Sequence, residues 1–222
     1  APLSRTLRAG ISLAPFGVLI ILLMLGSFED LAVLKEFGNR RERFVRELFN
    51  HIYLAGTAVT LAVIIGVPLG LLAWKRHRLE KPIFVVVNGI QTIPSLALFG
   101  LMIAPLAYLS QQFPALRSLG LRGIGNAPAL IALTLYALLP IVRNAYTSLA
   151  VIPNAVIDAG SGVGMSRRQL LRHVEVPLSV PIVLSGVRTS AVQAVGNTAV
   201  AALIGAGGLG RFVFQGLGQA AP

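Results

Sequence analysis

Few residues of this chain could carry out covalent chemistry or bind a metal. The sequence contains no cysteine, which excludes disulfides, thiolate metal sites and cysteine nucleophiles together. Its three histidines, His51, His77 and His173, are scattered and do not have the spacing of zinc ligands. The sequence therefore predicts no catalytic residue and no metal site.

One glycine-rich segment has the outline of a phosphate-binding loop. Gly205-Ala-Gly-Gly-Leu-Gly210 matches the G-x-x-x-x-G frame, but Arg211 replaces the lysine and Phe212 replaces the metal-binding hydroxyl residue. A phosphate-binding loop should also follow a strand, whereas this segment follows an apolar run. We therefore interpret it as a flexible glycine turn, and we expect no cofactor to bind this chain.

The composition explains why few residues could carry out catalysis or bind a metal. Hydrophobic residues make up 55% of the 222 residues and charged residues only 12%, whereas soluble globular chains carry about 25% charged residues. So few charges cannot cover a water-exposed surface, which argues against a soluble enzyme. The net charge of +11 could suggest nucleic acid, but the basic residues lie between apolar runs, as in membrane proteins. The sequence predicts an all-α polytopic transmembrane bundle and no nucleic-acid partner.

The apolar runs can be assigned to membrane spans, each of about 20 residues. Gly10–Phe28 predicts an anchor helix; a signal peptide is the alternative, but Glu29-Asp30 follows the run in place of a cleavage site. The polar segment up to Asn50 predicts an amphipathic surface helix that leads into the next span. The later predicted spans are Ile52–Trp74, Pro82–Leu109, Asn126–Thr147 and Leu178–Ile204.

The Pro82–Leu109 stretch contains Pro94 and Pro105 and could form one kinked helix or two short ones. The positive-inside rule places both the Lys75–Lys81 segment and the arginine-rich 151–177 loop in the cytoplasm. One crossing between 82 and 109 satisfies this condition, and two do not. The sequence thus predicts one proline-kinked helix, hence five spans, with a sixth span missing or only begun in this chain.

Several polar residues lie inside the predicted spans. Arg188 is about ten residues into the last span, where a charge costs about 3 kcal/mol or more and must face protein or water. Two interpretations remain open: a path or gate residue, or an arginine that binds backbone carbonyls freed by a helix break near Pro181. The other candidate path residues, which could equally bond between helices, are Gln91, Thr92, Ser95, Asn197 and Thr198.

The 151–177 loop is the most informative segment. Pro153 suits a helix start, and Gly162 and Gly164 should end that helix after about two turns. Ser166 with Gln169 forms a capping-box pattern for a second helix, which we expect Pro177 to end. Ala159 and Gly160 give the first helix a small-residue face that would let another surface approach closely. Apolar residues in such a loop favour a protein partner over lipid headgroups alone.

The residues Asp158-Ala-Gly-Ser-Gly-Val-Gly164-Met, followed by Val176-Pro177-Leu178, resemble the EAA motif of the permease subunits of type I ABC importers. Further blocks are similar to the osmoprotectant branch, which imports glycine betaine, choline and related solutes. These blocks are Gln91-Thr-Ile-Pro-Ser-Leu-Ala-Leu98, Tyr136-Ala-Leu-Leu-Pro-Ile-Val-Arg-Asn144, Gly186-Val-Arg-Thr189 and Ala201-Ala-Leu-Ile-Gly-Ala-Gly-Gly-Leu-Gly210. The resemblance covers about residues 50 to 218. Two departures, Asp158 for the leading glutamate and Ser161 for the usual arginine, could change the strength of coupling.

The resemblance implies that the loop docks as a coupling helix on a separate cytoplasmic ATPase, which binds ATP and magnesium. It also implies a second permease subunit, identical or homologous, an extracytoplasmic solute-binding protein, and a multi-pass location in a bacterial or archaeal cytoplasmic membrane. The residues expected to dock are Asp158, Ala159, Gly160, Ser161, Gly162, Gly164 and Met165.

We therefore expect an anchor helix and polar external segment (1–50), an ABC transporter transmembrane domain (51–218) and a tail (219–222). The predicted function is import of compatible solutes such as glycine betaine or choline, powered by the separate ATPase. A permease for methionine or another amino acid is the first alternative. A secondary transporter or channel is disfavoured, because the only carboxylates beyond residue 80, Asp158 and Glu175, lie in the loop and not in the spans.

Overall fold

The computed structural model describes residues 32–118 and 120–220, so the predicted anchor helix Gly10–Phe28 lies outside the described residues. The chain divides into two compact units, Ala1–Arg46 and Glu47–Pro222. In the described part of the first unit, the rings of Phe37 and Phe44 pack edge to face with centroids 5.3 Å apart. Between them Arg40, with φ −120° and ψ 16°, interrupts the helical geometry.

Helix α2 (Ala32–Lys75) consists of two helical parts that meet at the kink at Arg40. The described residues contain no strand, and four of their helices are long and apolar enough to cross a membrane, namely Phe37–Lys75, Ser95–Gln112, Asn126–Ala150 and Arg167–Ile204. The remaining elements are α3 (His77–Thr92), α4 (Ser95–Gln112), α5 (Pro114–Ser118), α6 (Asn126–Ala150), α7 (Asn154–Gly162), α8 (Arg167–Leu170), a π-helix (Leu171–Glu175), α9 (Val176–Ala201), a 3₁₀ turn (Ala202–Ile204) and α10 (Gly210–Ala220).

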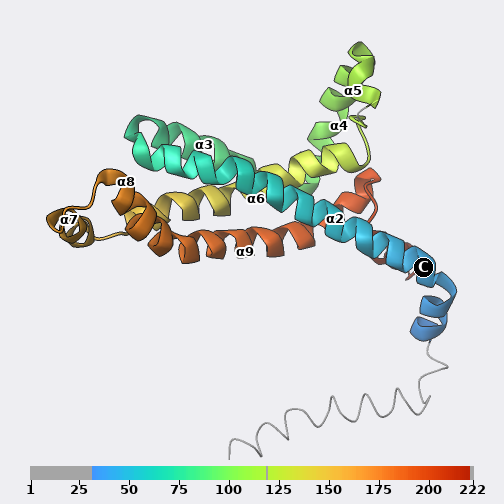
Figure 1. Ribbon diagram of the computed structural model, residues 1–222. Coiled ribbons are helices and arrows are strands. Elements are labelled where there is room, and N and C mark those ends of the chain that lie inside the picture. The colour runs from blue at the N-terminus through green and yellow to red at the C-terminus, as the bar shows by residue number, and fades with distance from the viewer. Residues whose placement is uncertain (1–31, 119, 221–222) are drawn as a thin grey trace, which may run out of the picture. The chain divides into compact units, whose positions relative to one another are not determined.

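Helix α6 is the centre of the second unit, because α3, α4 and α9 all pack against it (Figure 1). Small residues alternate with large ones at its buried positions: Ala132 and Ala145 are completely buried, and so are Ile141 and Val142. Gly70 of α2 also approaches it closely, since a Cβ there would lie 2.6 Å from the carbonyl oxygen of Val142. Apolar side chains gain little by leaving lipid, so close packing of small residues is what joins such helices.

The predicted single helix over Pro82–Leu109 is wrong, because the chain breaks into α3 and α4 at Ile93 and Pro94. Ile93 has extended backbone angles (φ −77°, ψ 126°), and so does Pro94 (φ −55°, ψ 139°). Proline disfavours helical geometry in the residue before it, whereas Pro105 lies inside α4 without ending that helix. Figure 1 shows α4 turning away from the direction of α3.

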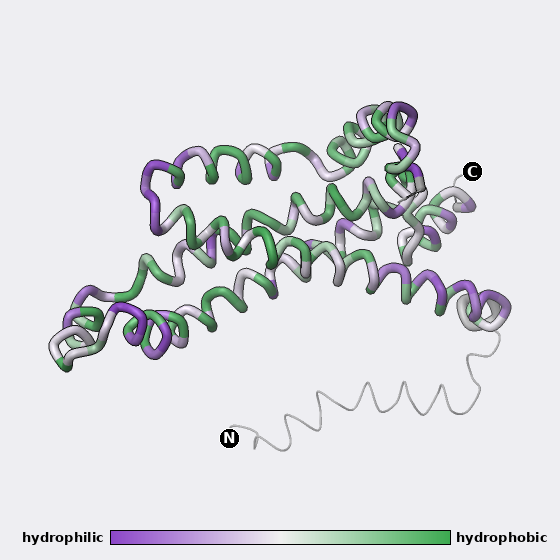
Figure 2. Tube along the Cα trace, turned by 45° about the horizontal axis from the view of Figure 1, so that its top comes forward, coloured by the Kyte–Doolittle hydropathy of each residue, from purple (hydrophilic) through white to green (hydrophobic). Residues whose placement is uncertain are grey.

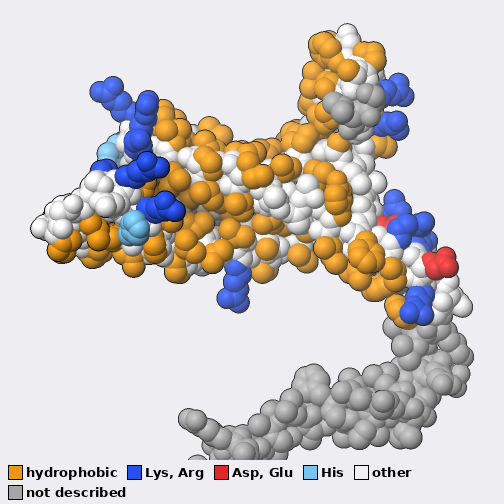
Figure 3. Space-filling model, in the orientation of Figure 1, with side chains coloured by type: hydrophobic (Ala, Val, Ile, Leu, Met, Phe, Trp, Pro, Cys, Tyr) orange, Lys and Arg blue, Asp and Glu red, His pale blue; other side chains and the backbone are white. Residues whose placement is uncertain are grey.

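The second unit has two distinct ends. Helices α2 and α6 finish, and α3 and α9 begin, at the end that carries α7 and α8 (Figure 1). Gly125, just before α6, donates its N–H to the carbonyl oxygen of Ile204 at 2.9 Å, so α6 begins beside the finish of α9 at the opposite end. The tube in Figure 2 is hydrophobic between these ends and more hydrophilic at the turns. In Figure 3, Lys and Arg side chains gather over the α7–α8 end, so the two basic segments lie on one side, as the positive-inside rule requires.

Candidate functional site

The α7–α8 loop is a defined helical hairpin. Helix α7 begins after Pro153, which has extended angles (φ −63°, ψ 138°). The chain then reverses at Gly164, whose φ of +85° strongly favours glycine. Backbone bonds from Val163 to Ala159 (3.2 Å) and from Met165 to Gly160 (3.1 Å) close the turn. These bonds hold α8 beside α7.

The capping box at the start of α8 is confirmed. The Ser166 hydroxyl accepts the N–H of Gln169 at 3.4 Å, and the Gln169 side-chain oxygen accepts the N–H of Ser166 at 2.8 Å. These bonds satisfy N–H groups that a helix start leaves free. Ser166 is thus the N-cap of α8, the second helix of the hairpin.

The expectation that Pro177 ends the second helix is wrong. The chain continues from α8 through the π-helix into α9, and Pro177 lies in the first turn of α9. A π-turn shifts the backbone hydrogen-bond register by one residue, and it lies just before Pro177, which has no N–H for the regular helical bond. The hairpin is therefore joined to α9 by continuous helix, with no loop between them.

Gly160 does not form the outward docking face that its size predicts. It is buried in the hairpin, where a Cβ would overlap Leu170 Cδ1 and lie 3.5 Å from the sulfur of Met165. The surface that approaches Gly160 is thus α8 of the same chain. Sequence spacing gave the small-residue face correctly but not its direction, because that depends on how the turn folds back.

The remaining predicted docking residues form the outer surface of the hairpin. Met165 is 37% exposed, and Val163, which lies between these residues but is not in the predicted set, is 77% exposed. Large apolar residues in this position project beyond the ends of the spans, away from the bundle core. The other exposed members of the predicted set are Asp158, Ala159, Ser161, Gly162 and Gly164.

A buried ion pair at the base of the hairpin was missed by sequence reasoning. Glu175 is 2% exposed, and its Oε1 accepts a hydrogen bond from Arg167 Nη1 at 2.5 Å. Its Oε2 is buried without a hydrogen-bond partner among the described residues, next to a cavity of about 250 Å³ that Trp74 and Ile157 help to line. A buried carboxylate depends strongly on its one cation, so Arg167 ties α8 to the start of α9.

The polar residues near the α3–α4 break hold that break against α6. Pro140 has no N–H, so the carbonyl oxygen of Tyr136 lacks its usual helical donor. The side-chain amide of Gln91 donates to that oxygen at 2.7 Å. In return the Tyr136 hydroxyl donates to the carbonyl oxygen of Ile93. Gln91, a predicted path residue, thus completes the backbone hydrogen bonding of α6.

Two other predicted path residues form hydrogen bonds within their own helices. The hydroxyl of Thr198 is buried and donates to Ala194 at 2.7 Å, and that of Thr92 donates to Gly89 at 2.7 Å. Ser95 and Asn197 are half-buried.

Arg188 is exposed on α9 and has no hydrogen-bond partner within residues 32–118 and 120–220. Helix α9 runs unbroken through Pro181, so the structure does not contain the helix break that one interpretation of Arg188 required. The side chain faces away from its own bundle.

The glycine turn at the opposite end is ordered, not flexible as predicted. Glu47 of α2 is buried, and its carboxylate accepts the N–H of Gly208 at 2.7 Å and Arg211 Nη1 at 2.8 Å. Gly207 and Gly208 both have φ near +80°, which turns their backbone toward α2. The turn thus surrounds an anion, but the anion is a carboxylate of the same chain.

His51 and Asn50 complete this contact, which we call the Glu47 cluster (Glu47, Asn50, His51, residues 206–209 and Arg211). His51 Nδ1 accepts the N–H of Leu209 at 3.3 Å, so its Nε2–H donates to the carbonyl oxygen of Val195 at 3.1 Å. Asn50 donates to Ala206 at 2.7 Å. The spacing of Glu47, Asn50 and His51 on one helix face was a signal that sequence reasoning could have used.

The helical spans, the two basic segments at the α7–α8 end and the projecting hairpin are together typical of a polytopic component of a transport system. The family match agrees: residues 59–220 match the family described as binding-protein-dependent transport system inner membrane component. The chain belongs to this family and is a multi-pass protein of the cytoplasmic membrane.

Individual relatives are informative about the branch. The chain is 45% identical over 169 residues to the osmoprotectant import permease protein OsmW of Salmonella typhimurium, which covers 76% of this chain and 74% of that protein. It is 36% identical over 172 residues to the glycine betaine/carnitine/choline transport system permease protein OpuCD of Bacillus subtilis, covering 78% and 68%.

Solved structures support the fold. An inward-facing structure of the MetNI methionine ABC transporter superposes with a TM-score of 0.63 at 26% identity, covering 78% of this chain and 79% of that one. The predicted all-α fold of the ABC permease kind is therefore confirmed.

Proposed function

We propose that this permease forms the membrane path for compatible solutes such as glycine betaine or choline. Relatives named for osmoprotectant, glycine betaine and choline transport are 36–45% identical over about three quarters of the chain, which supports this solute class. A methionine or other amino-acid solute is the second candidate, favoured by the similarity to the methionine transporter at 26% identity.

The observation that carries the coupling role is the projecting α7–α8 hairpin with its exposed apolar tip. We propose that this tip docks on a separate cytoplasmic ATPase, where ATP and magnesium bind. The exposed residues of the predicted set, from Asp158 to Met165, would make the contact, and Gly160 would hold the hairpin in shape. Because α9 continues directly from α8, movement of the docked hairpin would be passed to a span without a flexible joint.

Recognition of the solute would be left largely to an extracytoplasmic binding protein. A quaternary ammonium is held tightly by aromatic rings around the cation. Two of the span tyrosines have other roles, since Tyr136 binds Ile93 and the ring of Tyr146 packs edge to face on Phe84 with centroids 5.4 Å apart. The permease would act with a second permease subunit around a low-affinity path, with Arg188 as its charged residue and Gln91, Thr92, Ser95, Asn197 and Thr198 as further candidates.

Docking can be tested with Val163→Glu. The substitution puts a charge on the most exposed apolar residue of the hairpin, so it should abolish solute uptake and co-purification of the ATPase while membrane insertion is unchanged. Ile124→Glu is the matched control, since Ile124 is 62% exposed outside the spans at the opposite end. Wild-type uptake by Val163→Glu would show that the hairpin is not the docking element.

The solute and the path are tested in liposomes that contain the permease, its ATPase and its binding protein. Glycine betaine or choline should be imported, and Arg188→Ala should lower the flux without changing the affinity of the binding protein. Import of methionine but not betaine would favour the second candidate. Micromolar betaine binding to the isolated permease, measured by calorimetry, would contradict the division of roles.

A further inference from the structure

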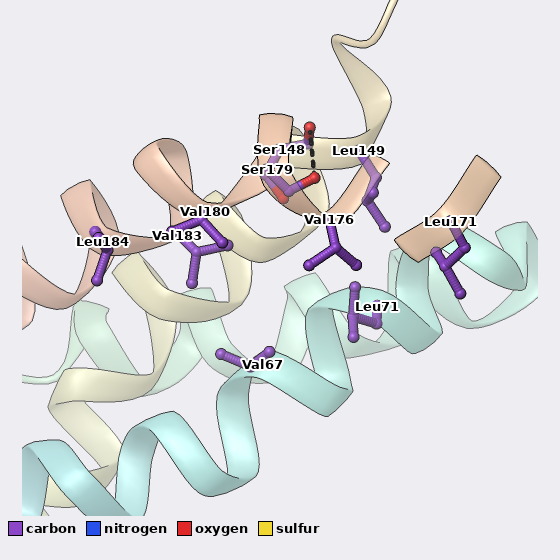
Figure 4. A pocket seen from close by; sticks show the side chains of 10 residues that line it. All are labelled: Val67, Leu71, Ser148, Leu149, Leu171, Val176, Ser179, Val180, Val183 and Leu184. Atoms are coloured by element: carbon purple, nitrogen blue, oxygen red, sulfur yellow. Dashed lines mark hydrogen bonds between the residues drawn. The ribbon is translucent and has the colours of Figure 1, made fainter. Parts of the chain in front are cut away.

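An apolar groove lies between α2, α6 and α9 near the α7–α8 end. Its volume is about 400 Å³. In Figure 4, Val176, Val180 and Val183 of α9 point toward Val67 and Leu71 of α2. The hydroxyl of Ser179, the one polar group of α9 in the wall, is already bonded to the carbonyl oxygens of Ser148 (3.3 Å) and Glu175 (2.7 Å). The groove therefore presents an apolar surface, which suits an apolar occupant.

This groove continues into a basic mouth. A second hollow of about 580 Å³ shares Leu71, Leu149 and Leu171 with the groove and adds four residues to its wall, which are Trp74, Lys75, His77 and Arg167. Lys75 is the last residue of α2 and Arg167 the first of α8, so these charges lie where the spans end.

The charges of the mouth are not all neutralised within the chain. His77 lies 3.4 Å from the carboxylate of Glu80, and Arg167 uses one nitrogen for Glu175, but the Arg167 side chain is still 63% exposed. Lys75 is exposed and forms no ion pair among the residues that the structure describes. The mouth is thus positive and open to an anionic group.

The length of the groove fits one leaflet of a bilayer. Leu171 and Leu184 mark its two ends on the π-helix and α9, and thirteen residues of helix extend about 20 Å. Half of the hydrocarbon core is about 15 Å thick. An acyl chain that starts at the basic mouth would therefore end near the middle of the membrane.

We propose that this composite site binds one anionic phospholipid of the cytoplasmic leaflet. One acyl chain lies in the groove among the valines of α9, and Lys75 and Arg167 bind the phosphate. Basic pockets between membrane helices on the cytoplasmic side are suited to anionic headgroups. A zwitterionic lipid would leave the positive mouth uncompensated, and an apolar protein helix would do the same.

Trp74 makes the proposal testable without a transport assay, because it is the only tryptophan of the chain and lines the mouth. The full chain is placed in phosphatidylcholine nanodiscs that contain increasing fractions of lipid brominated on the acyl chain, either phosphatidylglycerol or phosphatidylcholine. Brominated phosphatidylglycerol should quench Trp74 fluorescence at a clearly lower mole fraction than brominated phosphatidylcholine.

Variants separate the two halves of the site. Lys75→Gln removes one headgroup charge and should weaken the preference for phosphatidylglycerol about fivefold. Arg78→Gln is the matched control, an exposed basic residue of the same segment outside the mouth. Val180→Phe fills the groove and should lower quenching by both lipids, whereas Val192→Phe, at a position 68% exposed elsewhere on α9, should not.

Three results would overturn the proposal. Equal quenching by both lipids would mean that only bulk lipid contacts Trp74. Quenching by neither would mean that protein covers the groove. If Lys75→Gln elutes normally on size exclusion and still prefers phosphatidylglycerol as strongly as the wild type, Lys75 does not bind the headgroup.

Discussion

The two ends of this permease use glycine in opposite ways. At the α7–α8 end, Gly160 lets two arms of one hairpin pack together while the apolar side chain of Val163 is displayed outside. At the other end, the glycines of residues 205–208 turn their backbone inward, where Gly208 donates to the buried Glu47. Glycine thus helps to build an exposed surface at one end and the buried Glu47 cluster at the other. The difference lies in whether a buried charged partner is present.

The largest effect expected from this comparison is that the two ends are accessible from opposite faces of the membrane. The chain has no native cysteine, so Val163→Cys and Ile124→Cys each supply a single thiol. A membrane-impermeant maleimide should label Val163→Cys only from the cytoplasm and Ile124→Cys only from outside. Labelling of both from one side would mean that the two ends are not on opposite faces of the membrane.

The next largest effect is expected in the Glu47 cluster. Glu47→Ala leaves the buried N–H of Gly208 and the half-exposed Arg211 without their anion, and leaving such buried hydrogen-bonding groups unsatisfied costs about 3 kcal/mol. The melting temperature in detergent should fall sharply, and Arg211→Gln should lower it as well, because that change leaves the buried carboxylate of Glu47 without its cation. Glu42→Gln, at an exposed position, is the control. A melting curve unchanged in Glu47→Ala would show that the turn needs no such anchor.

Packing within the hairpin should have a smaller effect. Gly160→Val forces branched carbons onto Leu170, and such overpacking costs about 1–3 kcal/mol. Limited proteolysis should then cut the 151–170 segment faster, and a second change, Leu170→Ala, should restore resistance by making room. If the double variant is cut as fast as the single one, Gly160 does not act through Leu170.

The smallest effect is expected at the cap. Ser166→Ala removes the hydroxyl that accepts the N–H of Gln169, and loss of a helix N-cap costs about 1 kcal/mol. Amide hydrogen exchange of the α8 backbone should rise modestly, while exchange in the Glu47 cluster stays unchanged. Faster hydrogen exchange at both ends would mean that the hairpin and the Glu47 cluster are not independent.

The sequence predicted those features that depend on local chemistry. The apolar helices that include Ile52–Trp74, Asn126–Thr147 and Leu178–Ile204 followed from apolar length, the capping box from Ser166 and Gln169, and the shared end of the two basic segments from charge. The sequence did not predict where chain segments meet. The position of the α3–α4 break against α6 depends on a hydroxyl 43 residues away, and the direction of Gly160 depends on the fold of the hairpin.

The buried charges were missed for the same reason. Glu47 and Glu175 look like ordinary polar residues of surface segments until their partners are known. Glu47 contacts a turn more than 150 residues away, and Glu175 meets Arg167, eight residues earlier, through the path of α8 and the π-helix.

The bond between Gln91 and α6 has a consequence for how this sequence can change over generations. Gln91 is needed because Pro140 deprives Tyr136 of its donor. A lineage that lost the proline could let position 91 drift, since the helix would then supply its own N–H. A lineage that lost Gln91 first would carry an unsatisfied carbonyl in the bundle. The order of the two substitutions therefore decides whether the intermediate is tolerated, so the histories of these two sites, 49 positions apart, should be linked.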